Sequence, residues 1–172
     1  MEIFNSRRLT NIGVVASVYV VTTLLCAPLA YNAVQFRVSE MLMLLCVFNK
    51  DYIISMTLGC LIANIFSSLG MIDAAFSTFA TLIAAVLMYM LRNKLNLFCL
   101  SLFPVISNAL IVGAEIKFVF HDPFWINAAW VALGEFVCVS ILGVIVFTGL
   151  KKNKGFMNLI TAGHNPSQGM KR

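Results

Sequence analysis

Apolar residues in this chain come in long runs that are separated by short polar segments. The runs cover residues 9–27, 36–48, 52–68, 74–91, 95–119 and 124–150. About 20 apolar residues suffice for a helix to cross the hydrocarbon core of a bilayer. The pattern therefore predicts an all-α fold, a polytopic membrane protein built as a bundle of six transmembrane helices.

The boundaries of these runs predict local features. The second run is short for a full span, so it either crosses with little tilt or begins below the surface. Pro104 should kink the fifth helix, and Asp122 with Pro123 should form the N-cap and first residue of the sixth. We expect residues 1–155 to form a single domain and residues 156–172 a loop-like, mobile C-terminal tail.

The charges orient the predicted bundle. The 172 residues carry 12 Lys and Arg and seven Asp and Glu, a net charge of +5. With the N-terminus and the C-terminus in the cytoplasm, all of the basic residues except Arg37 and Lys117 lie on the cytoplasmic side, as the positive-inside rule requires. The basic excess therefore indicates contact with the lipid bilayer and argues against binding of nucleic acid.

The acidic residues have the opposite distribution. Most of them map to the outer half of the bundle: Glu40, Asp73, Glu115, Asp122 and Glu135. An acidic mouth attracts a cation or a ligand that is rich in hydrogen-bond donors.

Motifs of enzymes are absent from the sequence. There is no zinc-protease, phosphate-loop or nucleophile-elbow pattern, and the five cysteines lie inside apolar runs without a C-x-x-C pair. We therefore expect no enzyme activity, no metal and no cofactor.

Arg37 and Glu40 lie three residues apart at the start of the second run, on one face of a helix. Ionised groups at such depth pair, line a wet cavity or bind a ligand. Two interpretations stay open: an ion pair that fixes the preceding loop, or direct contact with a ligand.

The fifth run carries Ser101, Asn108 and Glu115 at steps of seven, which keeps them on one helical face. Such a stripe either joins neighbouring helices by hydrogen bonds or faces a ligand. We favour the ligand face because Glu115 adds a charge that helix association does not need.

The sixth run places Asn127, Trp130 and Glu135 within one broad inward arc. Trp130 fits an interfacial or core position equally well. Glu135 is either paired with Arg37 or an anchor for a ligand.

Asn64 and Asp73 complete the candidate binding residues of the outer half. Each also has a structural interpretation. Asp73 is suited to cap the fourth helix, and Asn64 to bond a neighbouring helix.

Small residues form two stripes in the inner half. One consists of Gly13, Ala16 and Ser17, and the other of Ser55, Gly59 and Ala63. Such stripes allow close approach of another helix. They indicate either packing within the bundle or a docking surface for a second membrane protein.

Four stretches resemble the QueT family: VQFRVSEML (34–42), residues 49–76, SNALIVGAE (107–115) and FWINAAWVALGE (124–135). The resemblance covers roughly residues 8–150. It implies a substrate-binding (S) component of an energy-coupling-factor (ECF) transporter in the plasma membrane of a bacterium. Such a component captures a queuosine precursor, a 7-deazaguanine base, and works with a transmembrane coupling subunit and two cytoplasmic ATPase subunits.

The resemblance also implies roles for the candidate residues. A carboxylate suits the donor edge of the base, Asn, Arg or Lys suits its carbonyl oxygen, and Trp130 or Phe36 suits its ring. A second carboxylate would suit an aminomethyl cation. The chain departs from the family at Asn32-Ala33, where Gly-Pro is expected, and at Gly13 and Ser17, where alanines are expected.

Two alternatives remain open at this point. One is an S component or solo carrier for another small cationic or heterocyclic nutrient. The other is a membrane scaffold without a ligand, in which the polar residues of the outer half pair with one another and leave no cavity.

Overall fold

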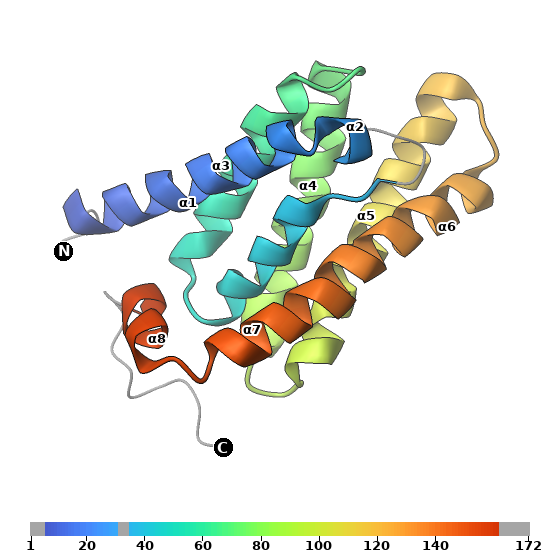
Figure 1. The fold of residues 1–172 in the computed structure, drawn as a ribbon. Helices are drawn as coiled ribbons and strands as arrows, with labels where there is room; N and C mark the ends of the chain where they lie inside the picture. Colours follow the sequence, from blue (N-terminus) through green and yellow to red (C-terminus); the bar gives the residue numbers. More distant parts are fainter. Residues whose placement is uncertain (1–5, 31–34, 162–172) are drawn as a thin grey trace.

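A computed structural model describes residues 6–30 and 35–161, and every element in these residues is helical (Figure 1). The elements are α1 (Ser6–Leu25), α2 (Ala27–Ala30), η1 (Val38–Val47), α3 (Asp51–Ile65), α4 (Met71–Leu91), α5 (Leu97–Phe120), α6 (Phe124–Glu135), η2 (Phe136–Gly143), α7 (Val144–Leu150) and α8 (Lys154–Thr161). The predicted all-α class is confirmed.

Four helices are long and apolar enough to cross a membrane: α1, α4, α5 and the continuous rod of α6, η2 and α7. The other two predicted spans are shorter apolar helices, η1 and α3. The third run was predicted to extend to residue 68, but α3 ends at Ile65. The polytopic pattern is therefore supported by four spans, with two shorter helices among them.

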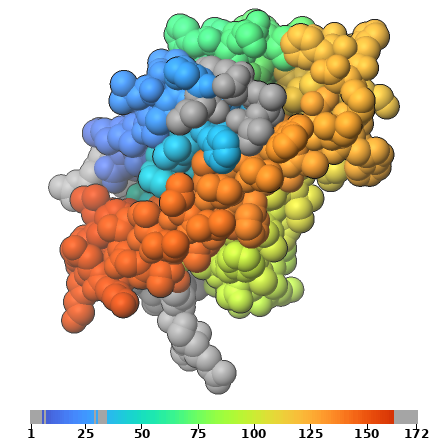
Figure 2. Space-filling model, turned by 45° about the vertical axis from the view of Figure 1, so that its right-hand side comes forward, coloured from blue at the N-terminus to red at the C-terminus, as the bar shows by residue number. Residues whose placement is uncertain are grey.

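The short helix η1 occupies the middle of the bundle. It packs against α1, α3, α4, α5, η2 and α7, while the long helices pack in chain order around it. Figure 2 shows part of η1 in cyan between α1 in blue and the α6–α7 rod in orange. A helix surrounded in this way must be apolar on nearly all sides, which explains the run Met41–Cys46.

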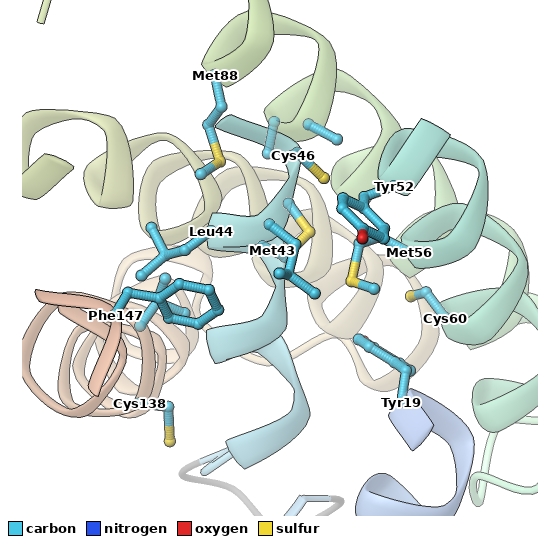
Figure 3. Packing of buried hydrophobic residues seen from close by; sticks show 14 of the residues in the cluster. Tyr19, Met43, Leu44, Cys46, Tyr52, Met56, Cys60, Met88, Cys138 and Phe147 are labelled. Atoms are coloured by element: carbon cyan, nitrogen blue, oxygen red, sulfur yellow. The ribbon is translucent and has the colours of Figure 1, made fainter. Parts of the chain in front are cut away.

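Soft and aromatic side chains fill the space around η1. Met43, Leu44 and Cys46 meet Met56 and Met88 from α3 and α4 in one buried cluster (Figure 3). Large apolar side chains also cover the outside, as Phe79 at 58% exposure and Ile145 at 66% illustrate. Apolar residues on both the inner and the outer faces are expected of helices surrounded by lipid.

Two helices depart from α geometry. η1 is a 3₁₀ helix of 10 residues, and η2 is a π-helix of 8 residues that begins directly after Glu135. The two pack together, and Gly143 lets them approach closely: a Cβ atom there would lie 3.1 Å from Leu44 Cδ1. Long 3₁₀ and π segments are uncommon and often mark functional sites.

The two ends of the bundle differ in charge. We call the end that holds residues 48–51, 91–97 and 151–161 the basic end. We call the end that holds residues 35–37, 65–73 and 115–127 the acidic end. Asp73, Glu115 and Asp122 belong to the acidic end, and Lys50, Arg92, Lys94, Lys151, Lys152 and Lys154 to the basic end.

The basic end corrects the prediction for the tail. Residues 156–161 belong to α8 rather than to a loop, and Ile160 is buried in the core cluster. The Asn49 side chain donates a hydrogen bond to the Ile160 carbonyl oxygen at 3.5 Å. The rest of the predicted tail, residues 162–172, lies outside the described residues.

Two predictions about the fifth and sixth helices also have an outcome. Asp122 does not cap α6, because the helix begins at Phe124 with Pro123 as its N-cap residue and without a capping side chain. Pro104 lies inside α5, which remains helical from Leu97 to Phe120.

Candidate functional site

A cavity of about 270 Å³ opens at the acidic end between the α3–α4 turn, α4, α5 and α6. Its polar lining consists of Gln35, Ser68, Asp73, Glu115, Asp122 and Asn127. The volume is close to the lower end of the range of about 300–1,000 Å³ for small-molecule sites. The lining combines two amides with three carboxylates, so it suits a small polar ligand.

Asp73 reaches this site from the first turn of α4. Its Oδ1 accepts hydrogen bonds from Ser77 Oγ at 2.7 Å and from an Arg37 guanidinium nitrogen at 3.4 Å. The predicted N-cap role for Asp73 is wrong, because Gly70 holds that position with a φ of 55°, which favours glycine. Asp73 instead holds the buried Arg37 in place.

Arg37 and Glu40 do not form the ion pair that one interpretation predicts. Arg37, at 1% exposure, bonds to Asp73 and to Ser77. Glu40 accepts a hydrogen bond from the Tyr19 hydroxyl at 2.5 Å. Both residues flank the start of η1, but their partners come from two different helices. Arg37 thus fixes the residue before η1 to α4, and Glu40 fixes the first turn of η1 to α1.

The predicted stripe on α5 divides into two parts. Ser101 Oγ donates to Ser140 Oγ at 2.9 Å, and Asn108 Nδ2 donates to Glu135 Oε1 at 3.0 Å. These two residues join α5 to the α6–α7 rod, as the helix-association interpretation predicts. Glu115 behaves differently: within the described residues, neither of its carboxylate oxygens has a hydrogen-bond partner.

Several further buried atoms at or near this site lack a partner among the described residues. They are Glu135 Oε2, Glu40 Oε2, Asn108 Oδ1, Asn64 Oδ1, Arg37 Nε and Gln35 Oε1. A buried polar atom without a partner costs about 1–3 kcal/mol, and more when it is charged. Native proteins contain few of them, so a concentration in one region calls for an explanation such as a bound ligand.

Asn64 and Glu135 do not have the structural partners that were predicted. The Asn64 amide donates to the Cys60 carbonyl oxygen at 2.9 Å, within its own helix, rather than to a neighbouring helix. Glu135 is paired with Asn108, while the ion pair of Arg37 is with Asp73. The Glu135 carboxylate keeps one free oxygen in a fully buried position.

The segment before Arg37 lies directly on α6. A Cβ atom at Gly134 would stand 2.3 Å from the Gln35 carbonyl oxygen, so only glycine permits this contact. Gln35 also lines the cavity, so this contact joins the cavity wall to α6 at the residue before Glu135. Gly134, Tyr19 and Ser77 also belong to this region, although the sequence pattern does not single them out. A glycine beside a buried glutamate inside an apolar helix was the available signal for the first.

The remaining candidates on α6 lie at the edge of the site. Asn127 is half-buried, lines the cavity and donates to the Pro123 carbonyl oxygen at 3.2 Å. Trp130 is 45% exposed and does not line the cavity, so its predicted inward position is wrong. Because one side of α6 packs on α5, the indole at position 130 falls on the outward side.

The two stripes of small residues have different surroundings. A Cβ atom at Gly59 would lie 3.0 Å from Tyr19, so this stripe packs α3 against α1 inside the bundle. Gly13 and Ser17 are exposed, and a Cβ atom at Gly13 would meet nothing within 4 Å. Ala16, between them, is buried at 7% exposure. The stripe on α1 therefore leaves two of its three residues open to a partner.

The described residues contain no group of three or more His, Cys, Asp or Glu side chains that could hold a metal ion.

Comparisons with known proteins point to a family of transporters. The QueT transporter family matches residues 9–152, a range that includes α3 to α6 and the whole polar lining. "Queuosine precursor transporter QueT" of Lactococcus lactis subsp. cremoris (strain MG1363) is 35% identical over 157 residues, 84% of this chain and 92% of that protein. No solved structure gives a significant match. The chain belongs to the QueT transporter family.

Proposed function

We propose that this chain is the S component of an ECF-type importer, which captures a queuosine precursor and delivers it inward with an ATPase module. The observation that carries the proposal is the set of buried, unpartnered polar atoms beside the cavity of the acidic end. The curated relative supports the substrate, since its name identifies a queuosine precursor transporter.

The 7-deazaguanine ring suits the inner part of this site. Its ring N–H and exocyclic amine form a donor edge, which the free Glu135 Oε2 accepts while Asn108 holds the other oxygen. The free Oδ1 atoms of Asn108 and Asn64 are further acceptors, and the free Arg37 Nε donates to the carbonyl oxygen of the base. The ring site would adjoin the cavity through Gln35, which lines the cavity and contacts Gly134, the residue before Glu135.

The orientation follows from the charges. The basic end faces the cytoplasm under the positive-inside rule, and the acidic end then faces outward, where the precursor arrives. The exposed Gly13 and Ser17 on α1 offer close approach to a transmembrane coupling subunit. The two ATPase subunits bind this assembly from the cytoplasmic side.

A second candidate is an S component or solo carrier for another small cation or heterocycle. The three carboxylates of the lining favour it, because they would attract any cationic nutrient. A scaffold without a ligand fits less well: it requires the polar groups to satisfy one another, whereas Glu115 and Glu135 retain free oxygens beside a cavity.

The direct test is calorimetry with the purified full chain in detergent, without ATP, using a 7-deazaguanine base as ligand. We expect saturable 1:1 binding, and adenine, which lacks the donor edge, should not compete. Glu135→Gln should weaken binding by about 10- to 100-fold, because an amide N–H then meets the donor edge.

The control variant is Lys117→Gln, which changes the charge of an exposed residue on α5. Its affinity should equal that of the wild type. No binding of the base by the wild type, together with a different co-purified compound in mass spectrometry, would favour the second candidate. Unchanged affinity in Glu135→Gln would remove this residue from the site.

A further inference from the structure

Glu115 has a position that the ring-binding scheme leaves unexplained. Its side chain is only 1% exposed, it lines the cavity, and both carboxylate oxygens lack a partner in the described part of the chain. Within the described residues, no hydrogen bond of Glu115 therefore explains why its carboxylate is buried. A buried carboxylate in this situation requires a counter-charge or a proton.

Among the described residues, the buried Arg37 attracts the Glu115 carboxylate electrostatically but forms no hydrogen bond with it. The cavity lining contains Asp73 and Asp122 besides Glu115, and it contains no Lys, Arg or His. The buried Arg37 donates its hydrogen bonds to Asp73 and Ser77. Lys117, two residues further along α5, is exposed. The cavity therefore carries an excess of negative charge around one unpaired carboxylate.

The spacing along α5 separates this carboxylate from the ring-binding groups. Glu115 and Asn108 are seven residues apart on one face, about 10 Å at 1.5 Å per residue. The donor edge of a 7-deazaguanine and the substituent on its C7 atom point toward opposite ends of the flat molecule. A base held by Glu135 and Asn108 would thus direct its C7 substituent toward the cavity and Glu115.

We propose that Glu115 determines specificity for a precursor that carries an ammonium group on its C7 substituent over a neutral precursor with the same ring. This inference rests on the proposed function. The ammonium donates charge-assisted hydrogen bonds to the free Glu115 oxygens, the strong class of hydrogen bond in proteins. A neutral substituent leaves the carboxylate unpaired and its burial uncompensated.

The test compares two probes that share the ring: 7-aminomethyl-7-deazaguanine, which is cationic at neutral pH, and the neutral 7-cyano-7-deazaguanine. Calorimetry on the purified full chain should give at least about 10-fold tighter binding of the aminomethyl compound, which is about 1.4 kcal/mol. Glu115→Gln keeps the shape and removes the charge. It should lower the affinity for the aminomethyl probe by about 10-fold or more and change that for the cyano probe by less than about three-fold.

Two further variants give contrasting results. Glu135→Gln should weaken both probes by the same factor, because it acts on the shared ring. Lys117→Gln, a charge change on the outward side of α5, should leave both affinities and their ratio unchanged.

Each outcome has one meaning. Equal affinity of the wild type for the two probes overturns the charge selection and leaves the proposed function standing. Equal weakening of both probes by Glu115→Gln overturns it as well, because Glu115 then binds the ring. Unchanged affinities in Glu115→Gln indicate a protonated, bystander carboxyl group and also overturn it. If neither probe binds, the proposed function fails, and the inference fails with it.

Discussion

The two ends of the bundle treat their buried polar groups in opposite ways. At the basic end, Arg8 forms an ion pair with Asp51, and the Asn49 side chain accepts from the Asp51 N–H and donates to Ile160. At the acidic end, Glu115 keeps both carboxylate oxygens free within the described residues, and deeper in the bundle Glu135 keeps one. One end closes its hydrogen bonds within the chain, and the other leaves them open.

This difference shows in which part of the chain unsatisfied polar groups lower the free energy of unfolding. A fold gains most when all of its buried polar groups are satisfied, and proteins depart from this rule at functional sites. The departures here are concentrated beside one cavity and beside the 3₁₀ and π helices η1 and η2. Under the proposed function, the acidic end is arranged for a ligand, while the basic end and the core cluster hold the bundle together.

The largest expected effect comes from breaking the pair that the acidic end does satisfy. Arg37→Ala leaves Asp73, at 6% exposure, with Ser77 as its remaining partner. An uncompensated buried charge of this kind costs about 3–5 kcal/mol, and thermal unfolding in detergent should show the loss. The double variant Arg37→Ala with Asp73→Ala should recover part of it. If the double variant is as unstable as the sum of the single variants, the two residues are not coupled.

A smaller effect is expected from the contact between Gln35 and α6. In Gly134→Ala the new Cβ atom would be 2.3 Å from the Gln35 carbonyl oxygen, so the backbone of that segment must move. We expect a loss of about 1–3 kcal/mol, as for other overpacked sites, together with weaker binding of the base.

Gly149→Ala is the matched control for this variant. A Cβ atom at Gly149 would meet nothing within 4 Å, and alanine in a helix is favoured by about 0.5–1 kcal/mol. The control should therefore be as stable as the wild type or more so. Equal behaviour of the two variants would show that the Gln35 contact is not held rigidly.

The open carboxylate at Glu115 leads to a prediction of opposite sign. Glu115→Gln removes an unpaired buried charge from the unliganded protein, so the melting temperature should rise, corresponding to a gain of about 1–2 kcal/mol. The measurement is thermal unfolding in detergent without ligand. A fall in melting temperature would indicate that the carboxylate has a stabilising partner in the unliganded state.

The sequence was sufficient for the features that depend on pattern and charge. The long apolar runs predicted the helices. The distribution of the acidic residues predicted which end of the bundle holds the cavity. The step of seven from Asn108 to Glu115 gave a common face. These features depend on composition and helical periodicity, which a single sequence contains.

Pairings between distant residues were beyond the sequence. Arg37 was three residues from Glu40, yet it pairs with Asp73, 36 residues away. Arg37 precedes η1 as its N-cap residue and has non-helical backbone angles, so helical spacing does not place its side chain on the face of Glu40. Trp130 fitted an inward arc on an ideal helix, but the packing of α6 on α5 turns it outward. Tertiary packing decided both cases, and periodicity does not encode it.

The smallest expected effect comes from the same chemical change at the basic end. Asp51→Asn removes the charge that pairs with Arg8, where the two side chains are 11% and 32% exposed. Because part-exposed ion pairs contribute about 0.2–1 kcal/mol, the melting temperature should fall slightly, and binding of the base should stay unchanged. Thermal unfolding and calorimetry on Asp51→Asn and on Glu115→Gln then compare the two ends of the bundle directly. Under our proposal, the Asp51 carboxylate stabilises the fold, whereas the Glu115 carboxylate destabilises the unliganded protein and binds the ligand. Equal signs of the two stability changes would contradict the division of roles between the ends.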